Sequence, residues 1–323
     1  MAQAITTLTR PEVVTPRMRT PFMQVAWHIA GNPPALLGFV VIVAMVFTAI
    51  FAPVIAPYPY DKQNFDAVEQ APSFAHWLGT DQLGRDMFSR VVWGARSAVF
   101  VIIMVTLVSL SIGITLGAAA GYFGGWVETI IMRVADILFA FPGLLFIFFI
   151  AATIKPGILN WAREVGLNDL AKSGYLDYAV VIIALGTVGW AGLARLVRAQ
   201  VLAVKEREFV IGARAIGVPT WKIIGRHVLP NSLAPVIVAL SMGMGDIALS
   251  EGYLSFLGIG LQPPAPSWGN IIADNAGRYW RTFPQMVWLV LIPGAVLAAI
   301  VFAFNFLGDG LNEALNPEIE RSK

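Results

Sequence analysis

Six long apolar runs, separated by polar segments, constrain this chain more than any other feature of its sequence. The runs cover residues 35–56, 97–122, 135–154, 178–196, 233–257 and 284–307. Each is close to or above the length of about 20 residues that a helix needs to cross roughly 30 Å of hydrocarbon. A soluble barrel of this length would not divide its apolar residues in this way. The sequence therefore predicts an all-α polytopic membrane protein with six transmembrane helices.

Composition supports a membrane protein and excludes several other classes. Hydrophobic residues make up 57% of the chain and charged residues 13%, whereas soluble domains carry about 25% charged residues. The net charge of +2 is too small to indicate a nucleic-acid partner, and the absence of cysteine excludes disulfides and thiol chemistry. Residues 1–34 are polar and basic and lack the short apolar core of a signal peptide, so we expect the first run to stay in the membrane.

Basic residues indicate how the spans are oriented. Seven of them lie between Arg195 and Arg226, after the fourth span. Cytoplasmic loops carry an excess of Lys and Arg, so we expect this segment and both termini to be cytoplasmic. The chain then divides into a cytoplasmic tail (1–34), a first span (35–56), an extracytoplasmic loop with an interfacial helix (57–96), a five-helix core (97–308) and a cytoplasmic tail (309–323).

Local spacings predict how the spans pack. Gly113, Gly117 and Gly121 recur every four residues, on one stripe of a helix where another backbone can approach closely, which predicts a packing seam. Pro142 removes a backbone donor within the third run and predicts a kink, either a hinge or a static bend.

Charge spacings predict two structural arrangements. Asp136 follows Arg133 by three residues, which predicts an ion pair on one helix face. The acidic and basic residues of segment 81–90 alternate at spacings of three to five, which predicts a salt-bridged interfacial helix ahead of the second span.

The sequence offers no chemistry that would power transport or catalysis. No Gly-Lys pair is present, so there is no phosphate-cradling loop of the Walker type. The three histidines are far apart and do not have zinc-protease spacing, and no Gly-x-Ser-x-Gly elbow occurs. We therefore expect no catalytic residues, no metal site and no cofactor bound by this chain. Energy must come from an ion gradient or from another subunit.

The segment 205–231, part of the core, is too short to cross the membrane and too apolar for a free loop. Phe209, Gly212, Ala213 and Ile216 recur at helical spacing and form one face of a short helix, and Gly217 is suited to end that helix. A second short helix is expected from residue 220, with Trp221 on its apolar side, before Leu229 and Pro230 lead into the fifth span. The alternatives are a solvated loop, a helix lying on the membrane surface and a docking element for a cytosolic protein.

Segment 205–231 and several other segments resemble a known family. Gly217, followed by His227 and then by Leu229 and Pro230, is similar to the loop motif of bacterial ABC-importer permeases. Further segments resemble the second permease subunit of the peptide (dipeptide and oligopeptide) branch: LGTDQLGRDMFSRVVWGAR at 78–96, AGYFGGWVETIIMRVADILFAFP at 120–142, FVIGARAIG at 209–217, LSFLGIGLQPPAPSWGN at 254–270 and FNFLGDGLNEALNP at 304–317.

This resemblance implies an architecture and a set of partners. The fold would be that of a type I ABC-importer permease in the bacterial inner membrane. The chain would pair with a homologous permease as a heterodimer and work with two cytosolic ATPases and an extracytoplasmic solute-binding protein. ATP and Mg would be bound by the partner subunits, and membrane lipid would surround the spans.

The resemblance also implies that segment 205–231 is the coupling segment, seated in a groove of an ATPase. The residues that would form it are Phe209, Gly212, Ala213, Arg214, Ile216, Gly217, Trp221, His227, Leu229 and Pro230. Three positions depart from the family motif, since Ile211 replaces an acidic residue, Gly212 replaces alanine and His227 replaces isoleucine. The small residues and Gly217, which would allow close seating, are kept.

Two carboxylates in the fifth span are candidates for a substrate path. Asp246 and Glu251 would be costly against lipid, so we expect both to face a cavity or a partner. They would either attract a cationic group of the substrate or pair structurally across the permease interface. A competing hypothesis is a self-sufficient secondary transporter, in which both would bind protons or sodium. The expected cargo is a peptide, with glutathione, a nickel chelate or an oligosaccharide as alternatives.

Overall fold

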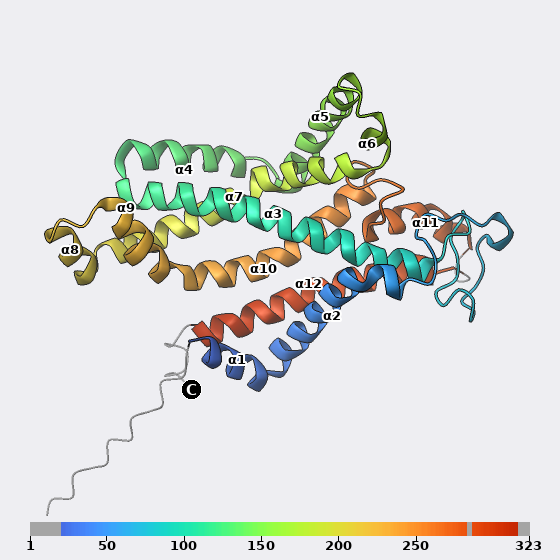
Figure 1. The fold of residues 1–323 in the computed structure, drawn as a ribbon, viewed down its shortest axis with the longest axis horizontal. Helices are drawn as coiled ribbons and strands as arrows, with labels where there is room; N and C mark the ends of the chain where they lie inside the picture. Colours follow the sequence, from blue (N-terminus) through green and yellow to red (C-terminus); the bar gives the residue numbers. More distant parts are fainter. Residues whose placement is uncertain (1–20, 283–285, 316–323) are drawn as a thin grey trace, which may run out of the picture.

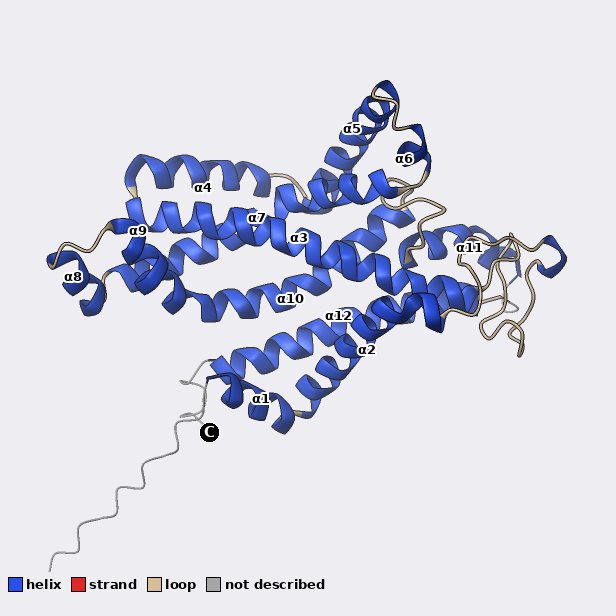
Figure 2. Cartoon of the chain, in the orientation of Figure 1, coloured by secondary structure: helices blue, strands red, loops and turns tan. Residues whose placement is uncertain are grey.

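The computed structural model describes residues 21–282 and 286–315, in which helices are joined by loops (Figures 1 and 2). Six helices in these residues are long and apolar enough to cross a membrane: α2 (Pro33–Ile55), α3 (Met87–Phe123), α5 (Gly143–Glu164), α7 (Tyr175–Lys205), the continuous stretch Thr220–Phe256 and α12 (Trp288–Leu315). The prediction of six spans in an all-α fold is confirmed.

The bundle has two different ends, which Figure 1 places at its left and right. One end, here called the α8 end, carries the short helices α8 (Glu208–Ala215) and α9 (Thr220–Ile223). The other, the α11 end, carries α11 (Trp268–Thr282), the loop between α2 and α3, and the one-turn helix η1 (Phe65–Ala67) within that loop. The long helices run between these ends, so each end gathers segments that are far apart in the sequence.

The glycine stripe of α3 packs against α7, as the spacing predicts. A Cβ on Gly117 would lie 2.6 Å from the Ala194 carbonyl oxygen, and one on Gly121 would lie 2.8 Å from the Arg198 carbonyl oxygen. Gly113 also meets a side chain of α7. The absent side chains let the backbones of α3 and α7 approach each other closely, and this seam lies at the centre of the bundle.

The third apolar run is divided into two helices. α4 (Gly125–Phe139) ends before Pro142, and α5 begins at Gly143. α4 lies along α3 and α7, whereas α5 turns away from the bundle (Figure 1). The kink predicted at Pro142 is therefore a complete break, because proline lacks the N–H that would continue the helical ladder.

The predicted pair between Arg133 and Asp136 is wrong. Asp136 of α4 instead pairs with Arg195 of α7, whose guanidinium lies over the Phe139 ring at 4.2 Å from its centroid. Glu128 of α4 also pairs with α7. Both carboxylates are directed toward α7 because that helix carries their guanidinium partners, Arg195 and Arg198.

The predicted interfacial helix at 81–90 is also wrong. α3 begins at Met87 and continues without interruption into the second span. Asp86 caps it, since its carboxylate accepts a hydrogen bond from the Ser89 N–H at 2.8 Å. The preceding residues form a turn rather than a helix. The charges that suggested an interfacial position are instead buried in an ion cluster at the α11 end.

This ion cluster consists of Asp81, Arg85, Arg90 and Asp274. Arg85 and Arg90 each contact the Asp81 carboxylate at 2.7 Å, and both reach Asp274 of α11 at 3.1 and 3.0 Å. Asp81, Arg85 and Arg90 are buried. Charge neutralisation therefore allows Arg85, in the turn before α3, and Arg90, in the first turns of α3, to be buried, and it fastens α11 to α3.

Both terminal regions contain more helix than the sequence predicts. α1 (Pro21–Gly31) lies within the expected cytoplasmic tail, and α12 continues to Leu315. Asn32 caps α2 and also donates a hydrogen bond to the Glu313 carboxylate at 2.9 Å. This contact ties the start of α2 to the end of α12, and Figure 1 shows the two beside each other.

An ion pair and two hydrogen bonds tie α5 to the start of α7 and to the loop after α10. α5 extends to Glu164 and is followed by α6 (Asn168–Lys172) before α7 begins. Lys155 of α5 pairs with Asp177 of α7 at 2.8 Å and donates to the Ile259 and Gly260 carbonyls, each at 3.3 Å. Much of segment 154–177 is therefore helical.

Candidate functional site

The α8 end contains the expected turn between helices. Gly217 follows α8 with φ of +80°, a conformation that favours glycine. Its N–H donates to the Arg214 carbonyl, and the Val218 N–H donates to the Ala213 carbonyl, both at 3.1 Å. These two bonds form a Schellman motif, which satisfies carbonyls at the helix end. The helix stop predicted at Gly217 is confirmed.

The second helix differs from the prediction. α9, the π-helical stretch η2 (Ile224–Val228) and α10 (Leu229–Phe256) form one continuous helix. Pro230 interrupts nothing, because it lies in the first turn of α10 directly after η2. A π-helical turn accommodates the missing donor and the proline ring. Segment 220–256 is therefore a single rod that begins at the α8 end.

Four side chains fasten α8 and the rod to the bundle. Val210 and Ala213 of α8 pack in one apolar cluster with Ile223 and Val228 of the rod, and Val201 of α7 belongs to the same cluster. Val210 and Val228 have no solvent exposure. Ala213, which was assigned to the docking face, therefore belongs to the anchor that holds α8 in place.

The opposite side of this segment exposes large apolar side chains. We call Phe209, Ile211, Ile216 and Trp221 the α8 surface. Ile216 is 82% exposed and Trp221 is 70% exposed. Gly212 lies among them on α8 with open space around it. Two different sides thus exist on a short helix, one packed into the bundle and one without a covering element.

The remaining residues assigned to the coupling segment have mixed positions. The guanidinium of Arg214 lies over the Tyr122 ring of α3, 5.7 Å from its centroid. His227 and Leu229 are half-buried in the rod, and Leu229 packs against the apolar cluster. Pro230 is exposed. The structure therefore brings the ten predicted residues into one region but divides them between an exposed surface and its support.

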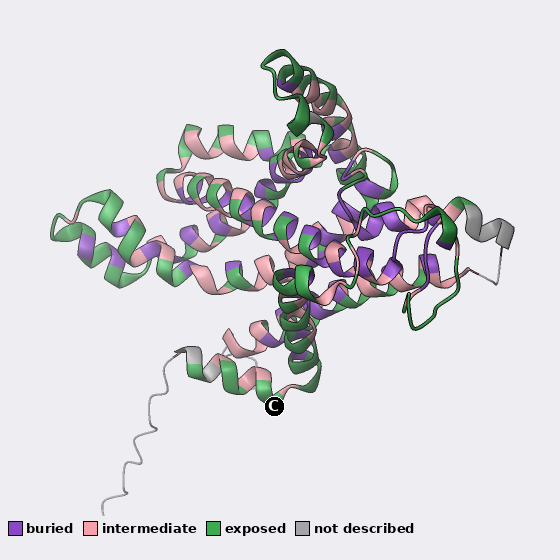
Figure 3. Cartoon of the chain, turned by 45° about the vertical axis from the view of Figure 1, so that its right-hand side comes forward, coloured by how far each residue is buried: buried purple, intermediate pink, exposed green. Residues whose placement is uncertain are grey.

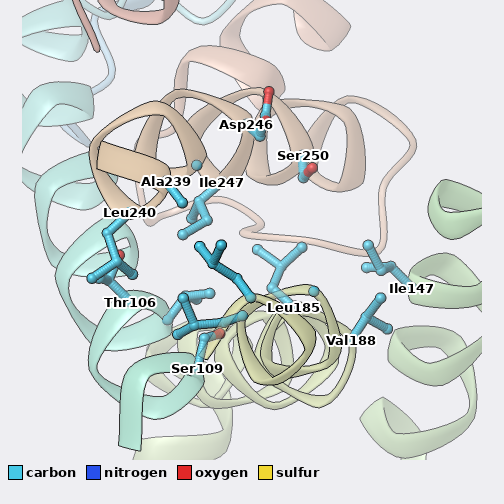
Figure 4. Close-up of a pocket in the computed structure, with 16 residues that line it drawn as sticks. Thr106, Ser109, Ile147, Leu185, Val188, Ala239, Leu240, Asp246, Ile247 and Ser250 are labelled. Atoms are coloured by element: carbon cyan, nitrogen blue, oxygen red, sulfur yellow. The ribbon is translucent and has the colours of Figure 1, made fainter. Parts of the chain in front are cut away.

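A central cavity of about 340 Å³ lies between α3, α5, α7 and α10, near the middle of the bundle (Figure 4). Its walls are mostly apolar, and Ile147, Leu185 and Ile247 are among them. Polar side chains come from two helices: Thr106 and Ser109 from α3, and Asp246 and Ser250 from α10. The residues that line the cavity are Val105, Thr106, Ser109, Ile147, Leu185, Val188, Gly189, Gly192, Leu193, Leu196, Ala239, Leu240, Gly243, Asp246, Ile247 and Ser250.

The structure separates the two carboxylates that the sequence grouped together. Asp246 lines the central cavity and is exposed, so it lies at the rim. Glu251 is buried, and its carboxylate accepts hydrogen bonds from the Ser255 and Ser267 hydroxyls, both at 2.7 Å. Glu251 therefore fastens the loop before α11 to the end of α10 and does not share the position of Asp246.

The sequence did not single out Thr106, Ser109 or Ser250. Thr106 and Ser109 lie in the same apolar run as Ser111 and Thr115, which face away from the cavity lining. A hydroxyl in a transmembrane helix usually bonds to the carbonyl four residues earlier. No feature of the run distinguishes the hydroxyls that make that bond from those that do not, so only the packing of α7 and α10 against α3 identifies them.

Comparisons with known proteins agree with this architecture. Residues 113–321 match the family described as binding-protein-dependent transport system inner membrane component, and residues 20–72 match the N-terminal TM domain of oligopeptide transport permease C. The dipeptide transport system permease protein DppC of Alkalihalophilus pseudofirmus is 36% identical over 302 residues, which cover 93% of this chain and 91% of that protein.

Other relatives extend over similar lengths. The oligopeptide transport system permease protein OppC of Bacillus subtilis is 32% identical over 90% of this chain and 88% of its own length. The glutathione transport system permease protein GsiD of Pectobacterium atrosepticum is 34% identical over 97% and 96%. Six apolar helices and near full-length similarity to such permeases lead to one conclusion: the chain is a multi-pass inner-membrane protein that belongs to the family of binding-protein-dependent transport system inner membrane components, the permeases of ABC importers.

Proposed function

We propose that this chain is one of two membrane-spanning permeases of an ATP-driven peptide importer. It pairs with a homologous permease, receives substrate from an extracytoplasmic binding protein and is driven by two cytosolic ATPases that bind ATP and Mg. The named dipeptide and oligopeptide permeases among its relatives support the substrate class, and the glutathione permease GsiD supports a short peptide. The chain itself carries no ATPase site in this proposal.

The α8 surface is the single observation that carries the proposal. Exposed apolar groups toward lipid need no partner, but this surface lies beyond the long helices, at the tip of the α8 end (Figure 1). The same segment is rich in basic residues, which supports a cytoplasmic position. An apolar surface in water indicates a protein contact, and a cytosolic ATPase is the partner that this importer requires there.

The anchor of α8 explains how such a contact would transmit force. Val210 and Ala213 hold α8 against the rod through Ile223 and Val228. A packed apolar cluster is nearly incompressible, so a push on Ile216 or Trp221 moves the rod instead of deforming a loop. The rod reaches the central cavity at Asp246 without interruption.

Substitution of Ile216 tests this proposal directly. Ile216→Asp places a charge in the proposed contact, and since Ile216 is 82% exposed the change leaves the fold intact. We expect at least a tenfold loss of ATPase co-purification and of transport. Truncation of a central interface residue lowers the free energy of binding by about 2 kcal/mol or more, and a charge should do the same. The measurement is affinity capture of the co-expressed ATPases, followed by uptake in reconstituted vesicles.

Phe74→Asp is the matched control, because Phe74 is an exposed apolar residue at the α11 end. It should leave ATPase capture unchanged. Equal capture by the wild type and the Ile216→Asp variant would refute the assignment of α8 as the coupling element.

A further inference from the structure

Two hydroxyl groups of α3 are buried beside the central cavity without a bond. Thr106 and Ser109 are each 6% exposed and line the cavity, and neither hydroxyl oxygen has a hydrogen-bond partner among the residues that the structure describes. A buried hydroxyl without a partner destabilises a protein, because it has given up its hydrogen bonds to water. This site contains two such hydroxyls.

Other hydroxyls on the membrane helices satisfy themselves locally. They donate to the carbonyl four residues earlier at 2.7–3.0 Å: Ser111, Thr115, Thr187 and Ser241. This is the usual arrangement in a transmembrane helix. Thr106 and Ser109 depart from it where α7 leaves room, because a Cβ on Gly189 would lie 2.6 Å from the Ser109 hydroxyl oxygen. The glycine therefore keeps space for that hydroxyl.

The carboxylate of Asp246 supplies the second kind of polar group at this cavity. Asp246 and Ser250 lie on α10, across the apolar walls from Thr106 and Ser109 (Figure 4). Among residues 21–282 and 286–315, no hydrogen-bond or ion-pair partner of Asp246 is found. A carboxylate within a membrane-spanning segment is expensive unless it meets a cation or water.

These groups complement one class of ligand. The carboxylate accepts hydrogen bonds from an ammonium group, and the hydroxyls donate to a carbonyl oxygen, while the apolar walls contact a side chain. The cavity volume of about 340 Å³ lies within the range of small-molecule sites. A short peptide carries an ammonium group at its amino terminus and amide carbonyls along its backbone, so it can reach both walls.

We propose that the central cavity is a substrate subsite in which Asp246 binds the amino-terminal ammonium of a peptide and the Thr106 and Ser109 hydroxyls, on the opposite wall, bind an amide oxygen further along its backbone. The proposal rests on the proposed function, because the ligand is the cargo of the importer. It assigns this permease a part in substrate selection in addition to that of the binding protein.

The test measures uptake of radiolabelled trialanine by the reconstituted full transporter. Asp246→Asn removes the charge and should lower uptake about tenfold, the loss expected for one charge-assisted hydrogen bond. Asp246→Glu keeps the charge and should retain most of the uptake. Asp309→Asn, an exposed carboxylate of α12 away from the cavity, is the matched control and should behave like the wild type.

Thr106→Val gives a readout that a structural hydroxyl would not produce. Valine keeps the shape and removes the unbonded group, so the variant should raise the melting temperature of the transporter while uptake falls severalfold. Ser111→Val, at a hydroxyl that is bonded within α3, should not raise the melting temperature.

The outcomes separate the two proposals. If the wild-type transporter does not import trialanine, the proposed peptide function fails. If it does, and Asp246→Asn and Thr106→Val import at the wild-type rate, the subsite is refuted. Loss of the partner permease from the Asp246→Asn complex would also refute the subsite, because the carboxylate would then be a structural group of the permease interface.

Discussion

The two ends of the bundle satisfy their polar and apolar groups in opposite ways. At the α11 end, the ion cluster of Asp81, Arg85, Arg90 and Asp274 neutralises its own charges, and Glu251 is bonded to two serines. At the α8 end, large apolar side chains are exposed, and α8 itself is held mainly by the apolar cluster around Val210 and Ala213. Figure 3 shows buried residues concentrated near α11, and exposed residues both over the α8 end and along the loop between α2 and α3.

This difference indicates which end is held in one arrangement by its own polar contacts. Buried ion pairs and hydrogen bonds fix one arrangement, because breaking any of them leaves a charge or a donor unsatisfied. An exposed apolar surface gains energy only when another protein covers it. The base of the α11 end is therefore fixed by its own polar contacts, although its loop also exposes Phe74, whereas the α8 surface would gain energy from a protein that covers it.

The largest expected effect comes from the centre of the ion cluster. Asp81→Asn removes the charge that both Arg85 and Arg90 contact at 2.7 Å, which leaves Asp274 to neutralise two guanidinium groups. Breaking a buried ion pair in this way costs about 3–5 kcal/mol. Thermal unfolding of the purified transporter should show a clear loss of stability and of recovered protein.

The control is Asp136→Asn, which removes an exposed pair between α4 and α7. Exposed pairs contribute about 0–1 kcal/mol, so this variant should unfold close to the wild type. Equal destabilisation by both substitutions would mean that the ion cluster is not the main tie at the α11 end.

A smaller loss should follow from closing a backbone approach at the α11 end. A Cβ on Gly269 of α11 would overlap the Gly252 carbonyl of α10. Gly269→Ala should therefore force α11 outward and cost about 1–3 kcal/mol. The measurement is again thermal unfolding, and Gly277→Ala, where no atom lies within 4 Å, provides the control in the same helix. Matching melting temperatures for the two variants would contradict the close packing of α11.

The smallest expected effect is a gain in stability, and it concerns the α8 end. No atom lies within 4 Å of a Cβ built on Gly212, so Gly212→Ala should stabilise α8 by about 0.5–1 kcal/mol. If the α8 surface seats closely in an ATPase, the same methyl group should weaken ATPase capture. A variant that becomes more stable and also keeps full capture would argue against close seating at this position.

The apolar runs predicted the spans because the hydrocarbon demands length and composition of every crossing helix. The glycine stripe at 113–121 and the stop at Gly217 were also predictable, since each depends on residues within one or two turns. The start of α3 was not. Its charges were predicted to form a salt-bridged interfacial helix, and their burial depends on Asp274, which is 184 residues from Arg90.

Part of the candidate site was also predictable from residues close together in the sequence. Asp246 stood out because a carboxylate in an apolar run needs a cavity, and one is present. Glu251 carried the same signal, yet Ser267 of the following loop satisfies it. The hydroxyls of Thr106 and Ser109 gave no signal, because an unmade bond is a property of the packed bundle rather than of the run that contains them.

The unbroken helix from Thr220 to Phe256 has a mechanical consequence. Its 37 residues span about 55 Å, and Trp221 and Asp246 lie on the same shaft, roughly 37 Å apart. This stretch also contains two features that can bend a helix, the π-helical turn η2 and Pro235. A rotation imposed at Trp221 therefore passes through both before it reaches Asp246, so the stiffness of these two points sets how much of it arrives at the cavity.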